Sequence, residues 1–146
     1  MRKLLIPAFV LAATAAHAQA PAHEDGPGPN MVIEVAGADG TSKGTITLAL
    51  LADKAPNHVA RLVELAKAGA YDGVVFHRVI PGFMAQGGDG GRGDGTGGSS
   101  KPNLKQEFSK EPHVRGTCSM ARTMDPNSAN SQFFICFDDA RFLDGQ

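Results

Sequence analysis

The sequence predicts a mostly β domain, built as a small antiparallel barrel or a sandwich. Three observations favour this class of fold. Short runs rich in β-branched and aromatic residues recur along the chain, turns containing Gly, Asp or Pro separate them, and a single early segment has helical periodicity. A length of 146 residues, with 42% hydrophobic and 20% charged residues, favours one globular domain.

The N-terminus has the pattern of a signal peptide over residues 1–18. Arg2 and Lys3 form a basic start, residues 4–16 are almost entirely apolar, and Ala16-His17-Ala18 has the small-x-small spacing of a cleavage site. The apolar run is shorter than the roughly 20 residues that a membrane-spanning helix needs. We therefore expect export, cleavage after this tripeptide and no membrane span; a buried N-terminal helix is the alternative.

A linker and then a β-hairpin follow the cleavage site. Residues 19–30 are rich in Pro and Gly and lack apolar periodicity, so the domain is expected to occupy residues 31–146. Residues 31–35 are short and β-branched, and residues 44–50 alternate between apolar and polar or small side chains. The Asp-Gly turn chemistry in residues 37–44 predicts that these two strands form a hairpin.

One helix is predicted next. Asp53 can cap its N-terminus, Pro56 fits its first turn, and Gly69 fits the left-handed turn that ends a helix. The apolar residues that recur at helical spacing predict one buried face: Val59, Leu62, Val63 and Ala66.

The rest of the chain alternates short strands with loops. Four further strands are expected at residues 74–79, 84–87, 117–121 and 132–137. The glycine-rich stretch 87–98 and the polar stretch 122–131 are expected to be loops.

Composition and motifs exclude several classes of function. A formal net charge of −1 does not point to binding of nucleic acid or of an anionic membrane. Residues 93–98 match G-x-G-x-x-G, but no apolar helix follows that could place its N-terminus on a pyrophosphate. His58 and His77 lack nearby partners in the sequence for a metal site or a base and are expected to be structural. Cys118 and Cys136 fit buried strands; whether they pair stays open.

The run FHRVIPGFMAQGGD at residues 76–89 has the strongest chemical character. It places Arg78, an exposed-looking Phe83-Met84 pair and Gln86 around a Pro-Gly bend, so that a turn can bring them to one surface. The alternative is a core hairpin in which the aromatic and apolar residues are buried and Arg78 pairs with an acid.

Five sequence blocks resemble the signature blocks of the cyclophilin family, in that family's order and spacing. They are FHRVIPGFMAQGGD at 76–89, GTGG at 95–98, SMAR at 119–122, SQFFI at 131–135 and FLDG at 142–145. The stretch ARTMDPNSANSQFF is similar to the bacterial branch of the family. The resemblance implies a closed antiparallel eight-stranded barrel with flanking helices, here lacking the last strands and the C-terminal helix.

The resemblance also implies a peptidyl-prolyl cis-trans isomerase that needs no cofactor or metal. Arg78 matches the family's catalytic arginine. The positions that match the family's substrate-binding residues are Phe83, Met84, Gln86, Ala121, Arg122, Gln132, Phe134, Phe142 and Leu143. Because Phe142 stands where many members have Trp, an indole N–H donor is missing and weak cyclosporin binding is expected.

Together with the signal peptide, the resemblance predicts a periplasmic monomer that acts on proline-containing unfolded or exported polypeptides. The family continues beyond the position of Gln146, and the expected truncation leaves an alternative function open. In that alternative the protein is a proline-peptide binding module or folding helper without turnover.

Overall fold

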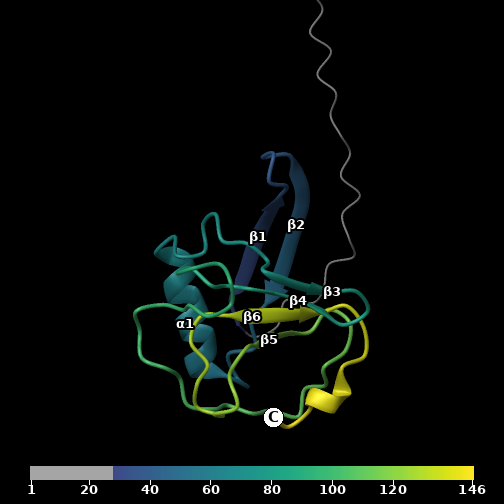
Figure 1. Cartoon of the computed structure of the whole chain (residues 1–146). Coiled ribbons are helices and arrows are strands. Elements are labelled where there is room, and N and C mark those ends of the chain that lie inside the picture. The colour runs from purple at the N-terminus through teal and green to yellow at the C-terminus, as the bar shows by residue number, and fades with distance from the viewer. Residues whose placement is uncertain (1–27) are drawn as a thin grey trace, which may run out of the picture.

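The computed structural model describes residues 28–146, which form six strands, one α-helix and one 3-10 helix (Figure 1). The predicted signal peptide and the part of the predicted linker up to residue 27 lie outside the described residues. The strands are β1 (Asn30–Ala36), β2 (Ser42–Ala49), β3 (Arg78–Ile80), β4 (Met84–Gly87), β5 (Cys118–Met120) and β6 (Phe133–Cys136). The helices are α1 (Pro56–Lys67) and the 3-10 helix η1 (Arg141–Leu143).

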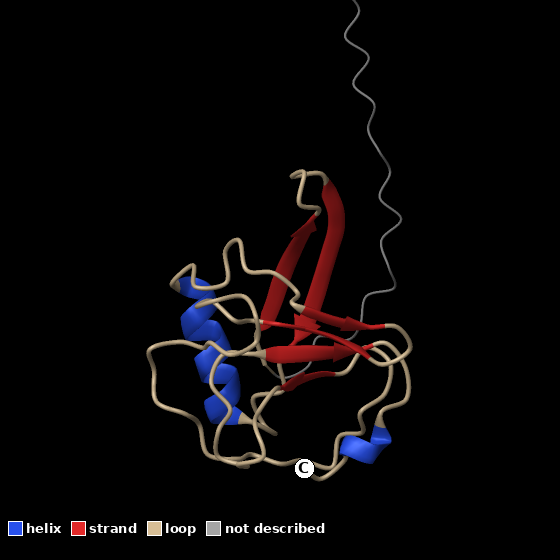
Figure 2. Ribbon diagram, viewed as in Figure 1, coloured by secondary structure: helices blue, strands red, loops and turns tan. Residues whose placement is uncertain are grey.

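The strands form two antiparallel sheets. β1 and β2 make a hairpin, and the other four strands are ordered β3-β4-β6-β5. Figure 2 shows the hairpin standing above the four-stranded sheet, with α1 at one side and η1 at the other. The predicted mostly β, antiparallel class with one α-helix is confirmed. The closed eight-stranded barrel stays a prediction.

Local turn chemistry explains the first hairpin. The Asp39 carboxylate accepts a hydrogen bond from the Thr41 backbone N–H at 3.0 Å, and Gly40 has a φ of 77°, which favours glycine. Ile33 then pairs with Ile46 across the two strands. The predicted strand–turn–strand unit is therefore confirmed, one or two residues away from its predicted ends.

The start of α1 differs from the prediction. Pro56 does lie in the first turn, but the N-cap residue is Ala55 and Asp53 does not cap the helix. Instead, the Glu107 carboxylate accepts hydrogen bonds from the backbone N–H groups of Asn57 and His58, each at 3.0 Å to Oε2. A carboxylate from a distant loop thus satisfies donors that the helix itself leaves free, and its negative charge suits the helix N-terminus.

The buried face of α1 is also rotated from the predicted one. Leu62 and Val59 are buried as expected, whereas Val63 is half-buried and Ala66 is exposed. Leu65 and Arg61 are buried instead. The apolar pattern could not predict the burial of Arg61, because a guanidinium is buried only where acceptors surround it. Here the acceptors are the backbone carbonyls of Pro102 at 2.9 Å and Asn130 at 3.4 Å.

The core lies between the hairpin, α1 and the inner face of the four-stranded sheet. Its buried residues are Met31, Leu48, Leu50, Val59, Leu62 and Phe133. The Phe133 ring makes edge-to-face contacts with Tyr71 and Phe76, with ring centroids 5.8 Å and 6.4 Å apart. One residue of β6 therefore joins the sheet to the segment that follows α1.

Two predictions about the later segments are settled. The strand predicted at residues 74–79 is wrong over 74–77, because the ladder with β4 runs only from Arg78 to Ile80. Cys118 and Cys136 are free thiols on β5 and β6. Burial raises the pKa of the Cys118 thiol to about 12, so it behaves as a small apolar core residue.

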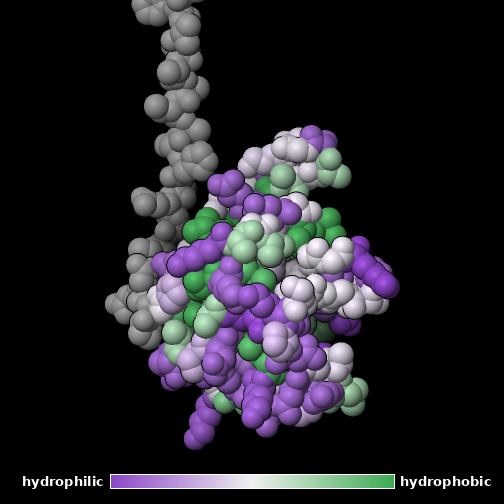
Figure 3. Space-filling model, turned by 90° about the vertical axis from the view of Figure 1, so that its left-hand side faces the viewer, coloured by the Kyte–Doolittle hydropathy of each residue, from purple (hydrophilic) through white to green (hydrophobic). Residues whose placement is uncertain are grey.

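Within residues 28–146, no helix combines the length and apolar character needed to cross a bilayer. Figure 3 looks at the side of the molecule that carries α1, and hydrophilic residues dominate the lower part of this face.

Replacing Glu107 by glutamine is expected to lower the free energy of unfolding by about 1–2 kcal/mol at pH 7, because one carboxylate oxygen that caps α1 becomes an NH₂ group. Burial raises the pKa of Glu107, but hydrogen bonds from His58 and Asn57 outweigh burial and hold it below its ordinary value of 4.5. A depressed pKa means that this contribution is present above pH 4.5 and is lost as the pH falls through the folded-state pKa.

Urea unfolding at pH 7 and pH 3.5 tests this prediction, and the gap between wild type and Glu107→Gln should shrink at the lower pH. Glu111→Gln is the matched control. The Glu111 side chain forms a surface ion pair with Lys54 at 3.5 Å, and its replacement should cost less than about 0.5 kcal/mol. An equal gap at both pH values would contradict the role of the Glu107 charge.

Candidate functional site

Three functional side chains lie in one row across the four-stranded sheet. Arg78 of β3 is directly opposite Gln86 of β4, and Gln86 is directly opposite Phe134 of β6. Residues paired in this way on antiparallel strands project to the same face of a sheet. The register therefore places a cation, an amide and an aromatic ring side by side, on the face opposite to Phe133 and the core.

The Arg78 guanidinium is available to a ligand. Arg78 is exposed, and among residues 28–146 its one hydrogen bond is a long contact of 3.5 Å from Nη1 to Gln86 Oε1. The alternative of a core hairpin is wrong, because Val79 beside it is 57% exposed and Arg78 has no acidic partner among these residues. Most of the guanidinium donors thus remain free to bind an acceptor.

Side-chain amides connect this row to the glycine-rich loop. Gln86 Nε2 donates to Gln132 Oε1 at 2.9 Å. Gln132 Nε2 in turn donates to the carbonyl oxygens of Gly95 and Gly97, at 2.9 Å and 2.8 Å. Two of the site residues predicted from the sequence, Gln86 and Gln132, are therefore in direct contact.

The aromatic site residues form two ring pairs. Phe83 packs on Phe142 of η1, with ring centroids 5.5 Å apart and planes inclined by 37°. Phe134 stacks on His113 with ring centroids 6.0 Å apart. Phe142 is 66% exposed and Leu143 is half-buried, so apolar surface at η1 remains open to solvent.

Met84 does not have the exposure that the sequence suggested for the Phe83-Met84 pair. Its side chain is only 1% exposed, whereas Phe83 is half-buried. Met84 pairs with Cys136, which is equally buried, and both project to the same face as Gln86 and Phe134. Other parts of the chain therefore cover Met84 on this face. Any contact of Met84 with a ligand would need its neighbours to move.

His113 is a residue of this region that the sequence analysis missed. Its ring Nδ1 lies 2.9 Å from Asp144 Oδ1, and its backbone N–H donates to the same oxygen at 2.8 Å. The backbone bond is the largest cause that lowers the pKa of Asp144. His113 thereby ties the segment after η1 to the Phe134 ring. No local signal could have found it, since Asp144 is 31 residues away in the chain.

A cleft of about 560 Å³ adjoins the row. Four of the residues predicted from the sequence line it: Gln86, Ala121, Arg122 and Gln132. The Arg122 guanidinium turns toward the Phe108 ring, 5.8 Å from its centroid, and donates to the Thr123 carbonyl at 2.8 Å. Arg122 can therefore border the cleft while its charge rests against the loop.

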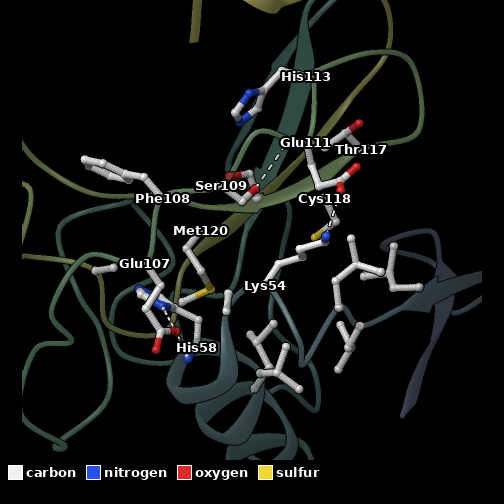
Figure 4. Close-up of a pocket in the computed structure, with 18 of the residues that line it drawn as sticks. Lys54, His58, Glu107, Phe108, Ser109, Glu111, His113, Thr117, Cys118 and Met120 are labelled. Atoms are coloured by element: carbon white, nitrogen blue, oxygen red, sulfur yellow. Dashed lines mark hydrogen bonds and ion pairs between the residues drawn. The ribbon is translucent and has the colours of Figure 1, made fainter. Parts of the chain in front are cut away.

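A larger cavity of about 830 Å³ lies between β2, α1 and β5 (Figure 4), and Arg122 lines both this cavity and the cleft. Two pairs of its charged or polar groups are partnered, His58 with Glu107 at 2.7 Å and Lys54 with Glu111 at 3.5 Å. The expectation that His58 has no nearby carboxylate is thus wrong, because the fold brings Glu107 to it from 49 residues away in the chain. Because Arg78, Gln86 and Phe134 are all outside this cavity, the candidate site is the row with its cleft.

Comparison with known proteins identifies one family for this chain. Residues 32–146 match the family model described as cyclophilin type peptidyl-prolyl cis-trans isomerase/CLD. The chain belongs to this cyclophilin family.

Two similar proteins are named as peptidyl-prolyl cis-trans isomerases. The chain is 58% identical over 113 residues to a "Probable peptidyl-prolyl cis-trans isomerase" of Brucella suis biovar 1, covering 70% of this chain and 58% of the relative. It is 50% identical over 105 residues to a "Peptidyl-prolyl cis-trans isomerase" of Synechococcus elongatus, covering 72% of this chain and 70% of the relative. The chain thus spans a little over half the length of the Brucella protein.

Two solved structures show the same fold. The cyclophilin AquaCyp293 from Hirschia baltica is 32% identical with a TM-score of 0.63, covering 70% of this chain and 57% of that one. A cyclophilin type peptidyl-prolyl cis-trans isomerase of Cryptosporidium parvum, crystallised in the presence of the dipeptide Ala-Pro, is 32% identical with a TM-score of 0.66. The coverage there is 70% of this chain and 67% of the other.

Proposed function

We propose that the protein is a peptidyl-prolyl cis-trans isomerase and that Arg78 is its catalytic residue. The observation that carries the proposal is the row of Arg78, Gln86 and Phe134 on one face of the sheet, beside the aromatic surface at η1. Family membership and the Ala-Pro dipeptide in the Cryptosporidium structure support an X-Pro peptide as the ligand.

The chemistry requires no covalent step and no cofactor. Rotation about an X-Pro bond is slow because the amide loses its resonance when twisted, with a barrier of about 20 kcal/mol. At the twist the proline nitrogen regains its lone pair and becomes a better hydrogen-bond acceptor. A guanidinium that donates to this nitrogen stabilises the transition state more than either planar form, and it stays charged at every relevant pH.

The other residues would hold the peptide in place. Phe83, Phe134, Phe142 and Leu143 would hold the proline ring, over a floor that contains Met84. Gln86 would donate to the peptide backbone. Ala121, Arg122 and Gln132 would line the subsite for the neighbouring residue, in the 560 Å³ cleft.

Arg78 would share the work with its surroundings. An acceleration of ~10⁵-fold requires about 7 kcal/mol of transition-state stabilisation. One hydrogen bond from a charged donor supplies roughly half of this at most. Desolvation of the proline and its orientation in the aromatic surface would supply the remainder.

We also propose that the protein acts on exported, proline-containing polypeptides in the periplasm. The basic and apolar N-terminus supports export. Weak cyclosporin binding is part of the same proposal, since the side chain of Phe142 carries no N–H donor.

A protease-coupled assay with an X-Pro peptide tests the proposed function on the wild-type chain. The expected result is a first-order cis-to-trans rate that rises in proportion to protein concentration, and free Ala-Pro should compete. Peptide binding with no acceleration would instead identify a folding helper without turnover and would remove the enzyme proposal.

A further inference from the structure

Asp89 organises the glycine-rich loop through a buried carboxylate. Asp89 is 2% exposed, and its two oxygens accept four backbone hydrogen bonds. Oδ1 accepts from Gly91 at 3.0 Å and Arg92 at 3.1 Å, while Oδ2 accepts from Gly95 at 2.9 Å and Gly97 at 3.0 Å. The loop thus folds around one side chain.

The carboxylate is ionised at any ordinary pH. Burial raises the pKa of Asp89, but the backbone N–H groups of the loop, that of Gly97 first, outweigh it and lower the pKa to about 2. A buried charge that is fully hydrogen-bonded in this way gives strong, oriented bonds.

The loop is shaped to approach this carboxylate closely. A methyl group on Gly97 would lie 2.2 Å from Asp89 Oδ1, which is too close for a real contact. Gly95 has a φ of 88°, and a methyl group there would lie 2.9 Å from His77 Nε2. Only glycine fits both positions, so the loop backbone is packed against Asp89 with little freedom.

The same two glycines fix the direction of Gln132. Their N–H groups are bound to Asp89 Oδ2, and their carbonyl oxygens accept both bonds from Gln132 Nε2. Two acceptors demand the NH₂ end of the amide, so the oxygen of Gln132 must point the other way. It points to Gln86 Nε2, at 2.9 Å.

The orientation continues to the guanidinium. Because Gln86 gives its NH₂ group to Gln132, its own oxygen faces Arg78 Nη1. An unbroken series of hydrogen bonds therefore runs from Asp89 through the loop, Gln132 and Gln86 to Arg78.

We propose that Asp89 is a positioning residue for isomerisation, which orients Gln132 and Gln86, and through them Arg78, by holding the carbonyl groups of Gly95 and Gly97. This proposal rests on the proposed function for its kinetic consequence alone; the orientation of the two amides is a property of the folded chain.

The test compares Asp89→Asn with Asp94→Asn in the full chain. Asn retains the shape of Asp89, but its single carbonyl oxygen can accept hydrogen bonds from only one of the two pairs of backbone N–H groups. Asp94 is the matched control, since it is in the same loop but exposed, and its oxygen accepts from the backbone N–H of Thr96 at 2.9 Å. Asp89→Asn should lower kcat about 10-fold with little change in KM, and Asp94→Asn should change kcat less than about twofold.

A double-mutant cycle separates positioning from a general loss of structure. If Asp89 acts through Gln132, then Asp89→Asn should have little further effect on kcat/KM in a Gln132→Ala background. Losses that multiply independently in the double variant would overturn the proposal. So would an Asp89→Asn variant that is folded and as active as wild type.

Nuclear magnetic resonance tests the orientation of the two amides independently of isomerase activity. In ¹⁵N-labelled protein, Asp89→Asn should shift the side-chain amide signals of Gln132 and Gln86, whereas Asp94→Asn should leave them in place. A wild-type chain with no isomerase activity would defeat the proposed function, yet these signals would still decide the orientation. Unshifted signals would overturn the role of Asp89.

If Asp89→Asn shows no cooperative unfolding transition, and so is not properly folded, Gly97→Ala is the second variant. It perturbs the contact between Gly97 and Asp89 without removing a polar group. It should shift the Gln132 amide signals and lower kcat in the same direction. Unchanged signals and kcat in a folded Gly97→Ala variant would contradict the proposal.

Discussion

Replacing Arg78 by alanine is expected to lower kcat/KM for X-Pro isomerisation by about 100- to 1,000-fold, the effect of removing one preorganised donor from a transition state. Arg78 is exposed and has a single long hydrogen bond to Gln86 among the described residues, so the fold does not depend on it. The free energy of unfolding should change by less than about 0.5 kcal/mol. Assays of activity and of urea unfolding on the same preparation measure both quantities.

Two further variants sharpen this result. Arg78→Lys retains the charge but loses the planar arrangement of donors, and it should recover only part of the rate. Arg115→Ala removes another exposed arginine, whose guanidinium donates to the Phe137 carbonyl at 2.7 Å, and it should leave kcat/KM within about twofold. Activity of Arg78→Ala within twofold of wild type would refute the assignment of the catalytic residue.

Replacing Phe133 by alanine is expected to lower the free energy of unfolding by about 3–5 kcal/mol. Phe133 is 4% exposed and packs edge-to-face on Tyr71 and Phe76, so its removal leaves a cavity at the centre of the core. This loss is a large part of the total stability of a typical domain. Urea unfolding at 25 °C measures it.

The next residue on β6 provides the control. Phe134 projects to the opposite face, is half-buried and stacks on His113. Phe134→Ala should cost only about 1–2 kcal/mol of stability but lower kcat/KM at least about 10-fold, since it removes part of the proposed proline surface. If the two substitutions had equal effects on stability, the assignment of the two faces of β6 would be wrong.

Much of the secondary structure could be predicted because it depends on neighbouring residues. The Asp39-Gly40 turn, the proline at the start of α1 and the glycine after its end are local rules, and all three hold in the structure. The strand at residues 74–77 could not be predicted correctly, because whether a strand forms depends on a partner. The pairing with β4 ends at Arg78 and Gln86, so residues 74–77 do not join this ladder.

The candidate site divides in the same way. The sequence blocks identified Arg78, Gln86 and Gln132. The antiparallel pairing of β3 with β4 then places Arg78 opposite Gln86. Sequence reasoning missed Asp89 and His113, whose partners are backbone groups or distant residues. It also misjudged Met84, since exposure depends on what packs above a strand.

The sequence by itself determined the first hairpin with its turn, the presence of α1 and the residues that carry the family's pattern, because each of these follows from a few adjacent side chains. Tertiary structure alone decided that Glu107 caps α1, that Arg61 is buried and that Asp89 connects to Arg78. In each case a charged or polar group is satisfied by atoms that are remote in the chain. Such pairings exist only after the chain has brought them within hydrogen-bond distance, and no spacing of residues records them.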